Sequence, residues 1–282
     1  MRWLIKLLII AGLGWSGYWF VGAKGQEKLL AEWLENSQNA GWVAETGNFG
    51  VTGYPNRFDT IINYLNLKGP RRNWGWQAEE FQIFALTYKT NHIILAWPGK
   101  QVVTNPQGSV TMQASEMRGS IEIAANTDLT LERLRAEATS IGVVSSLGWE
   151  GASEIATLAM FQDAEIDARY RLGLEMLDVT IPAEYMVAVT QLGQITDVIA
   201  RVHSAAFVEF EREINRDALT SGLPLWQSME VESATIDWGP ASLSMSGSLA
   251  PARNGYVDGE IDFHIKNWRI LFAAFEQMSA LP

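Results

Sequence analysis

The stretch "SLSMSGSLA", Ser242 to Ala250, decides the fold class. A serine occupies every second position, and the positions between hold Leu243, Met245, Gly247 and Leu249. This period of two is the side-chain period of a β-strand. A strand that is polar on one face and apolar on the other is typical of an antiparallel sheet with one solvated face.

The same alternation recurs elsewhere in the chain. It covers residues 162–174 ("QDAEIDARYRLGL"), 207–214 ("FVEFEREI") and 259–267 ("GEIDFHIKN"). Residues 81–99, "FQIFALTYKTNHIILAWPG", are apolar at both parities through much of their length. This pattern predicts a strand that lies between two layers or against an apolar cavity.

Three further stretches concern the helical content. Residues 128–142 and 184–202 each fit either a helix or a strand, whereas residues 267–281 fit a helix. The sequence therefore predicts a mainly β protein with minor α. A large curved antiparallel sheet, similar to an open barrel, forms a single domain over residues 42–282 and carries a C-terminal helix.

The N-terminus holds 17 residues without a charge, "LLIIAGLGWSGYWFVGA", Leu7 to Ala23. As a helix they span about 26 Å, and a start at Trp3 lengthens the span to about 32 Å, enough for a hydrocarbon core of about 30 Å. Arg2 and Lys6 predict a cytoplasmic N-terminus with the remaining chain exported. Trp15, Tyr18 and Trp19 are then expected at the outer membrane interface.

Two readings of this segment stay open. Val21, Gly22 and Ala23 are small residues that suit cleavage of a signal peptide over residues 1–23. The helical pattern, however, continues through this point as a stalk over residues 24–41 and stops at Gly41, which favours an uncleaved transmembrane anchor. The "GLGWSG" in this run matches a dinucleotide-binding pattern, but it lacks the preceding strand that such a site needs.

Composition excludes several function classes. The net charge is −11, and the one tight basic cluster is Arg71-Arg72 beside Lys68, so nucleic-acid binding is not expected. The absence of cysteine excludes disulfides, thiolate metal sites and cysteine nucleophiles.

No catalytic motif is present. His92, His203 and His264 lie far apart in sequence without ligand spacing, and no serine sits in a nucleophile elbow. Carboxylates recur at alternate positions over 163–167 and 258–262, with basic residues nearby, which fits a solvated strand face better than a catalytic pair. We expect no enzyme activity, no catalytic residue, no cofactor and no metal.

The chain has twelve tryptophans, several of them outside the N-terminal run. Their rings suit either packing in a core and at sheet edges or an apolar ligand groove, and both readings stay open. One hypothesis for the chain is that tryptophans line the concave apolar face of the sheet.

Two blocks carry a family resemblance: "GYPNRFD", Gly53 to Asp59, and the region from "IDWGPASLSMSGSLA" (236–250) through "GYVDGEIDFHIKNWRIL" (255–271). Together they resemble a bacterial family known only as domain of unknown function number 2125. The resemblance implies a membrane-anchored Gram-negative envelope protein without assigned catalytic residues. A looser similarity to AsmA-like envelope proteins implies a link to lipid transport and outer-membrane assembly. The family-motif residues are Gly53, Pro55, Arg57, Phe58, Asp59, Trp238, Gly239, Pro240, Trp268 and Arg269.

We expect these motif residues to be structural. Gly53 and Pro55 predict a bend or sheet edge, and Arg57 and Asp59, on one strand face, are expected to pair with neighbouring strands. The resulting hypothesis is a single-pass protein of the bacterial inner membrane with a periplasmic β-rich part that binds lipid or another envelope amphiphile. The alternative is a scaffold that docks other envelope proteins, and an envelope hydrolase ranks last for want of a motif.

Overall fold

The computed structural model describes residues 1–70, 73–182, 196–218, 222–252, 255–270, 272 and 276. These residues fall into two compact units, Met1–Ser109 (unit 1) and Val110–Pro282 (unit 2). The division lies inside the range 42–282 that the sequence predicts as one domain, and that boundary stays a prediction.

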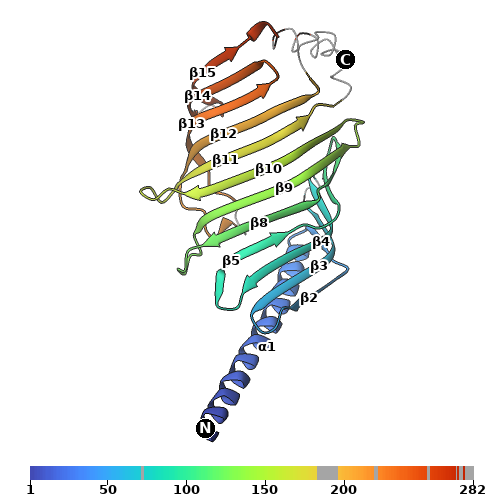
Figure 1. Ribbon diagram of the computed structural model, residues 1–282, viewed down its shortest axis with the longest axis vertical. Coiled ribbons are helices and arrows are strands. Elements are labelled where there is room, and N and C mark those ends of the chain that lie inside the picture. The colour runs from blue at the N-terminus through green and yellow to red at the C-terminus, as the bar shows by residue number, and fades with distance from the viewer. Residues whose placement is uncertain are drawn as a thin grey trace. The chain divides into compact units, whose positions relative to one another are not determined.

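Unit 1 combines one long helix with antiparallel strands (Figure 1). Strand β3 pairs with β1, β2 and β4, and β4 pairs with β5 and β6. The elements are α1 (Arg2–Asn39), β1 (Val43–Glu45), β2 (Asn48–Thr52), β3 (Arg57–Lys68), β4 (Gly75–Leu86), β5 (Lys89–Ala96) and β6 (Gln101–Asn105).

Helix α1 is continuous through residues 23 and 24, where cleavage of a signal peptide would fall. It is long and apolar enough to cross a membrane, which is compatible with a single-pass anchor. The helix ends where predicted, because Gly41 takes a left-handed φ of +85° and its N–H donates to Gln38 O.

The core of unit 1 lies between the C-terminal half of α1 and the sheet. Leu30 and Leu34 of the helix contact apolar side chains of the sheet because they recur at helical spacing on one face. The buried members of this cluster are Leu34, Ala44, Ile62, Leu65, Leu67 and Ala78.

Unit 2 is an antiparallel meander in which each strand from β8 to β15 pairs with the next, and β7 pairs with β9 (Figure 1). The strands are β7 (Gly108–Gln113), β8 (Glu116–Ile123), β9 (Leu131–Ser145), β10 (Glu150–Gln162), β11 (Arg169–Thr180), β12 (Val198–Phe210), β13 (Trp226–Trp238), β14 (Ala241–Pro251) and β15 (Val257–Lys266). A short helix begins at Trp268. The predicted class, mainly β with a large antiparallel sheet and a C-terminal helix, is confirmed.

Several details of the predicted strands are wrong. Residues 81–99 form two strands, β4 and β5, joined at Thr87–Tyr88, so their apolar residues at both parities do not belong to one strand. Residues 162–174 contain a hairpin turn, because Asp163 Oδ1 accepts the N–H groups of Glu165 and Ile166. Asp163, Glu165 and Asp167 therefore lie in a turn and not on a strand face.

The ambiguous stretch 128–142 is largely strand β9, because β8 and β10 hydrogen-bond to it on both sides. Most of the second ambiguous stretch, 184–202, lies outside the described residues, and β12 begins within it at Val198. The alternation over 207–214 holds only to Phe210. Beyond this residue the chain turns back, and Ile214 N–H donates to the Tyr170 hydroxyl at 3.0 Å.

Tyr170 is fully buried, and burial raises the pKa of its hydroxyl. Tyr170→Phe removes the acceptor for the buried Ile214 N–H, so we expect a loss of about 1–3 kcal/mol in the free energy of unfolding. Because the folded state favours the neutral phenol, wild-type stability should also fall as pH rises above about 10, the unfolded pKa. Urea unfolding at pH 7 and pH 10.5 tests both expectations. If Tyr170→Phe lost as much free energy of unfolding between these two pH values as the wild type does, Tyr170 would not be the cause of the alkaline loss.

Candidate functional site

The strand register of unit 2 gathers apolar side chains on one face of the sheet. Residues paired across antiparallel strands point to the same face, so the register defines rows that run across β8 to β15. Three such rows form what we term the apolar face: Met117–Ala138–Ala156–Met176–Val202–Ile236–Leu243–Ile265, Gly119–Ala136–Leu158–Leu174–Ser204–Ala234–Met245–Phe263 and Ile121–Leu134–Met160–Leu172–Ala206–Val231–Gly247–Ile261.

Ser204 is the one polar residue in these rows. A bulge in β13 lies between Val231 and Ala234, and the pairing on both sides of it keeps these two residues on the apolar face. With strands about 4.8 Å apart, the eight strands carry the face across a width of about 34 Å.

The opposite face of the same strands is polar and carries several ion pairs. Arg118 pairs with Glu137 at 2.6 Å, Arg201 with Glu175 at 2.7 Å, Arg169 with Glu230 at 2.8 Å and Arg171 with Glu232 at 2.9 Å. These side chains are largely exposed, so each pair adds little to stability, but together they mark this face as solvated.

The apolar face is not a conventional core. Most of its side chains are only half-buried, Leu158 is 44% exposed and Phe263 is exposed as well. All described strands of unit 2 belong to the one sheet, and no described helix or strand of this unit forms a second layer over the face. Soluble monomers rarely leave so large a contiguous apolar surface unfilled.

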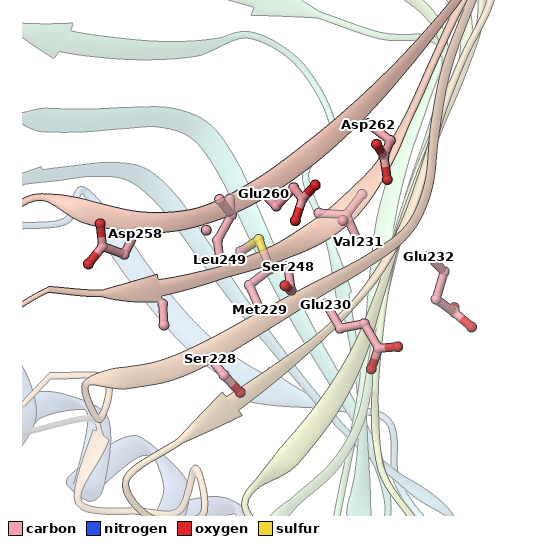
Figure 2. A pocket seen from close by; sticks show the side chains of 13 residues that line it. Ser228, Met229, Glu230, Val231, Glu232, Ser248, Leu249, Asp258, Glu260 and Asp262 are labelled. Carbon is pink, nitrogen blue, oxygen red and sulfur yellow. The ribbon is translucent and has the colours of Figure 1, made fainter.

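An open groove of about 860 Å³ lies over strands β13, β14 and β15. Figure 2 shows Met229 and Leu249, which pair across β13 and β14, with the acidic side chains of Glu230, Glu260 and Asp262 along the groove. The groove therefore combines apolar and acidic lining at the C-terminal edge of the sheet.

No tryptophan of unit 2 falls in the three rows, although Trp238 lies two residues beyond Ile236 on the same face of β13. That tryptophans line the concave face stays a prediction. Trp149 lies in the turn before β10, Trp226 and Trp238 lie at the two ends of β13, and Trp268 follows β15. Trp238 is buried and donates its indole N–H to Thr196 O, and the three rows hold mainly aliphatic and methionine side chains, together with Phe263 and Ser204.

In unit 1, the first family motif forms a junction with α1. Trp19 is 5% exposed, and its ring stacks on Phe58 with centroids 6.0 Å apart and meets Tyr54 edge-on at 5.5 Å. Gly22 is required by this contact, because a methyl group on it would lie 2.6 Å from Phe58 Cζ. Close approach of helix and strand thus depends on an aromatic pair and a glycine.

Hydrogen bonds fix the same junction. The indole N–H of Trp15 donates to Pro55 O at 2.9 Å, and that of Trp19 donates to Arg57 O at 2.7 Å. Tyr18 donates its hydroxyl proton to Thr87 O at 2.8 Å. The three aromatic residues that the sequence places at the membrane interface therefore contact the sheet of their own chain.

The turn before β3 explains the remaining motif residues. Gly53 takes a φ of +97°, and a side chain there would meet Arg57 O and Asp59 at about 3 Å. Arg57 and Asp59 pair with each other at 2.6 Å, and the Arg57 guanidinium also lies over the ring of Phe84 in the neighbouring strand β4. Pro55 lies at the tip of the turn, directly before β3.

The second family block lies at the C-terminal edge of unit 2. Trp238, Gly239 and Pro240 make the turn between β13 and β14, with Gly239 at a φ of +58°. Asn267 donates its side-chain amide to Pro240 O at 2.6 Å, which ties this turn to the end of β15. Trp268 and Arg269 follow, both exposed, with the guanidinium over the indole ring.

The residues considered for chemistry do not converge. Among the described residues no group of three or more His, Asp or Glu side chains could hold a metal ion. His264 lies exposed on the polar face, as its alternation predicts, and His203 lies on the same face in β12. Asp258, Glu260 and Asp262 line the groove of Figure 2, and the hydroxyl of Ser228 on the same groove donates to Glu209 at 3.3 Å.

Fold and surface together define a class: an amphipathic antiparallel sheet that follows a long apolar N-terminal helix. A family model described as "Uncharacterized protein conserved in bacteria (DUF2125)" matches residues 19–282. The chain belongs to this family, as its two motif blocks predict. No curated protein and no solved structure matches the chain, so the looser similarity to AsmA-like proteins has no support from these comparisons.

Proposed function

We propose that the protein is a non-enzymatic binding module that holds lipid acyl chains, or a similar envelope amphiphile, against the apolar face of unit 2. We further propose that α1 anchors it in the bacterial inner membrane, with the N-terminus in the cytoplasm and the β-rich part in the periplasm. The observation that carries the proposal is the apolar face itself, three rows over eight strands with half-exposed side chains and Ser204 as their one polar residue.

An acyl chain suits this surface chemically. The face offers aliphatic and methionine side chains, which adapt to flexible ligands, and its rows contain no charged group. Burial of a methylene group contributes about 0.8 kcal/mol, so a chain that buries half the surface of a dozen methylenes would gain about 5 kcal/mol before the cost of binding. A polar or highly charged ligand would gain nothing from these rows.

The basic residues in the first turns of α1 support the proposed orientation. Arg2 and Lys6 precede the uncharged run, which is the arrangement that keeps the N-terminus on the cytoplasmic side. A periplasmic β-rich part would then stand close to the inner membrane, from which an amphiphile could reach the apolar face.

The chain offers a matched pair of variants for the test. Leu158 on the apolar face and Ile155 on the polar face lie on the same strand and are similarly exposed, 44% and 37%. Leu158→Glu places a carboxylate where the acyl chain would lie, and its desolvation should weaken binding at least tenfold. Ile155→Glu adds the same charge to the solvated face and should leave binding unchanged.

The measurement is the amount of phospholipid that co-purifies with the full-length protein in a phosphate-free detergent, as phosphorus per mole of protein. The wild type and both variants carry the same lipid around α1, so a difference in phosphorus content measures the lipid that is bound to the sheet. We expect a lower value for Leu158→Glu alone. Equal values for all three would contradict the proposal, and a protein partner trapped at position 158 by crosslinking would favour the scaffold alternative.

A further inference from the structure

The sheet of unit 1 contacts α1 closer to its N-terminus than the point at which a complete membrane span would end. Residues 1–14 are exposed, and the first contact with the sheet is made by Trp15 (Figure 1). From Trp3 to Gly14 the helix is about 18 Å long, which is about 12 Å less than the hydrocarbon core it would have to cross. A complete span therefore needs residues 15–22 as well.

Residues 15–22 are the ones that hold two turns of the sheet. The turn at Tyr54–Asn56 is bound by Trp15 and also by Ser16, whose hydroxyl lies 2.8 Å from the Tyr54 hydroxyl. The turn at Thr87–Tyr88 is bound by Tyr18. If α1 crosses a bilayer, these two turns must enter its outer leaflet, because Trp15 lies about 10 Å short of Gly22, where the span ends.

From this geometry we infer that the turns at Tyr54–Asn56 and Thr87–Tyr88 lie within the outer leaflet of the bilayer that α1 enters. The inference rests on the membrane anchoring proposed above, and not on lipid binding by the apolar face. The inference gives the first family motif a second role. Besides holding α1 against the sheet, the motif presents a surface that contacts the membrane.

The backbone of the turns suits a layer that is poor in water, because the carbonyl groups of Pro55, Asn56 and Thr87 already have donors. Gly53 O accepts from Arg57 N, and Asn56 O accepts from both the N–H and the hydroxyl of Thr87. Pro55 O, Arg57 O and Thr87 O accept from Trp15, Trp19 and Tyr18. Satisfied backbone groups are the main requirement for entry into a membrane boundary.

The side chains of the turns suit the same layer. Tyr54 is 52% exposed and Tyr88 is 71% exposed, and tyrosine is enriched where apolar and polar membrane layers meet. Arg57 is paired with Asp59, so the turn brings no uncompensated carboxylate to the surface. The first acidic residue of α1 is Glu27, more than one turn beyond Gly22.

Because the chain has no cysteine, single labels test the inference directly in the full-length protein. Asn56→Cys places an environment-sensitive fluorophore in the first turn. Asn73→Cys is the control, an exposed asparagine near the other end of the 12-residue strand β3, about 36 Å away along the strand. Both proteins are reconstituted in vesicles of phosphatidylethanolamine and phosphatidylglycerol, with and without lipids brominated in the upper part of their acyl chains.

We expect about twofold quenching of the label at position 56 and none at position 73, in protein that floats with the vesicles. Equal quenching at both positions, quenching at neither, or failure to float would each overturn the inference. The lipid content of the apolar face is measured separately with Leu158→Glu, so the two proposals can fail independently.

Discussion

Trp19→Ala is expected to lower the free energy of unfolding by about 3–5 kcal/mol, the usual cost of truncating a buried tryptophan. The side chain is almost fully buried between Phe20, Tyr54 and Phe58, and its N–H is the donor for Arg57 O. The substitution leaves both a cavity and an unpaired carbonyl at the junction of helix and sheet.

Trp33→Ala is the matched control, since it removes the same residue type from the same helix at an exposed position. We expect it to cost less than about 1 kcal/mol. Denaturant unfolding followed by circular dichroism in detergent compares the two. Equal losses would contradict the claim that the first family motif pins the helix to the sheet.

Gly259→Ala is expected to detach β15 from the sheet. Gly259 takes a φ of +155°, and a methyl group on it would lie 2.0 Å from Ser248 O and 2.9 Å from Leu249 Cα. Both atoms belong to the backbone of β14, so no rotamer change can relieve the overlap, and we expect a loss of more than about 4 kcal/mol locally. Gly247 on the facing strand has the same requirement, with Glu260 O at 2.1 Å.

Hydrogen exchange with mass spectrometry measures the effect, because loss of β15 removes protection from β14 and β15 together. Gly173→Ala in β11 is the control. Its nearest neighbour is Ser204 O at 4.0 Å, so the added methyl group should cost less than about 1 kcal/mol. Unchanged protection in Gly259→Ala would show that β15 tolerates a side chain at position 259. The close pairing of β14 and β15 would then not depend on this glycine.

The period of two in the sequence was sufficient to predict the class of fold and the strands β14 and β15. It could not locate every turn, because alternation continues by chance through short loops. Asp163 illustrates this limit: its side chain looks like one more polar strand position, yet it caps the backbone of a hairpin turn. The boundary depends on a local hydrogen bond that periodicity does not encode.

The candidate site was predictable only in part. Alternation indicates an apolar face on each strand, but the alignment of Leu158, Leu174 and Met245 in one row depends on register, which the alternation within a single strand does not reveal. The roles of Trp15 and Trp19 were missed for a similar reason. Interfacial tryptophans and tryptophans that contact a sheet have the same local sequence pattern, and only the tertiary contact with Arg57 O and Pro55 O separates them.

The most direct test of lipid binding by the apolar face uses a photoreactive benzophenone analogue of phenylalanine. Phe263 lies on the apolar face in β15, and Phe161 lies on the polar face in β10, where Arg133 stacks over its ring. Both positions already hold phenylalanine, so the analogue adds one benzoyl group on opposite faces of the same sheet. Full-length protein is irradiated in intact cells, and the adducts are identified by mass spectrometry. The account predicts lipid adducts at position 263 and none at position 161, whereas lipid at neither position, or equally at both, would contradict it.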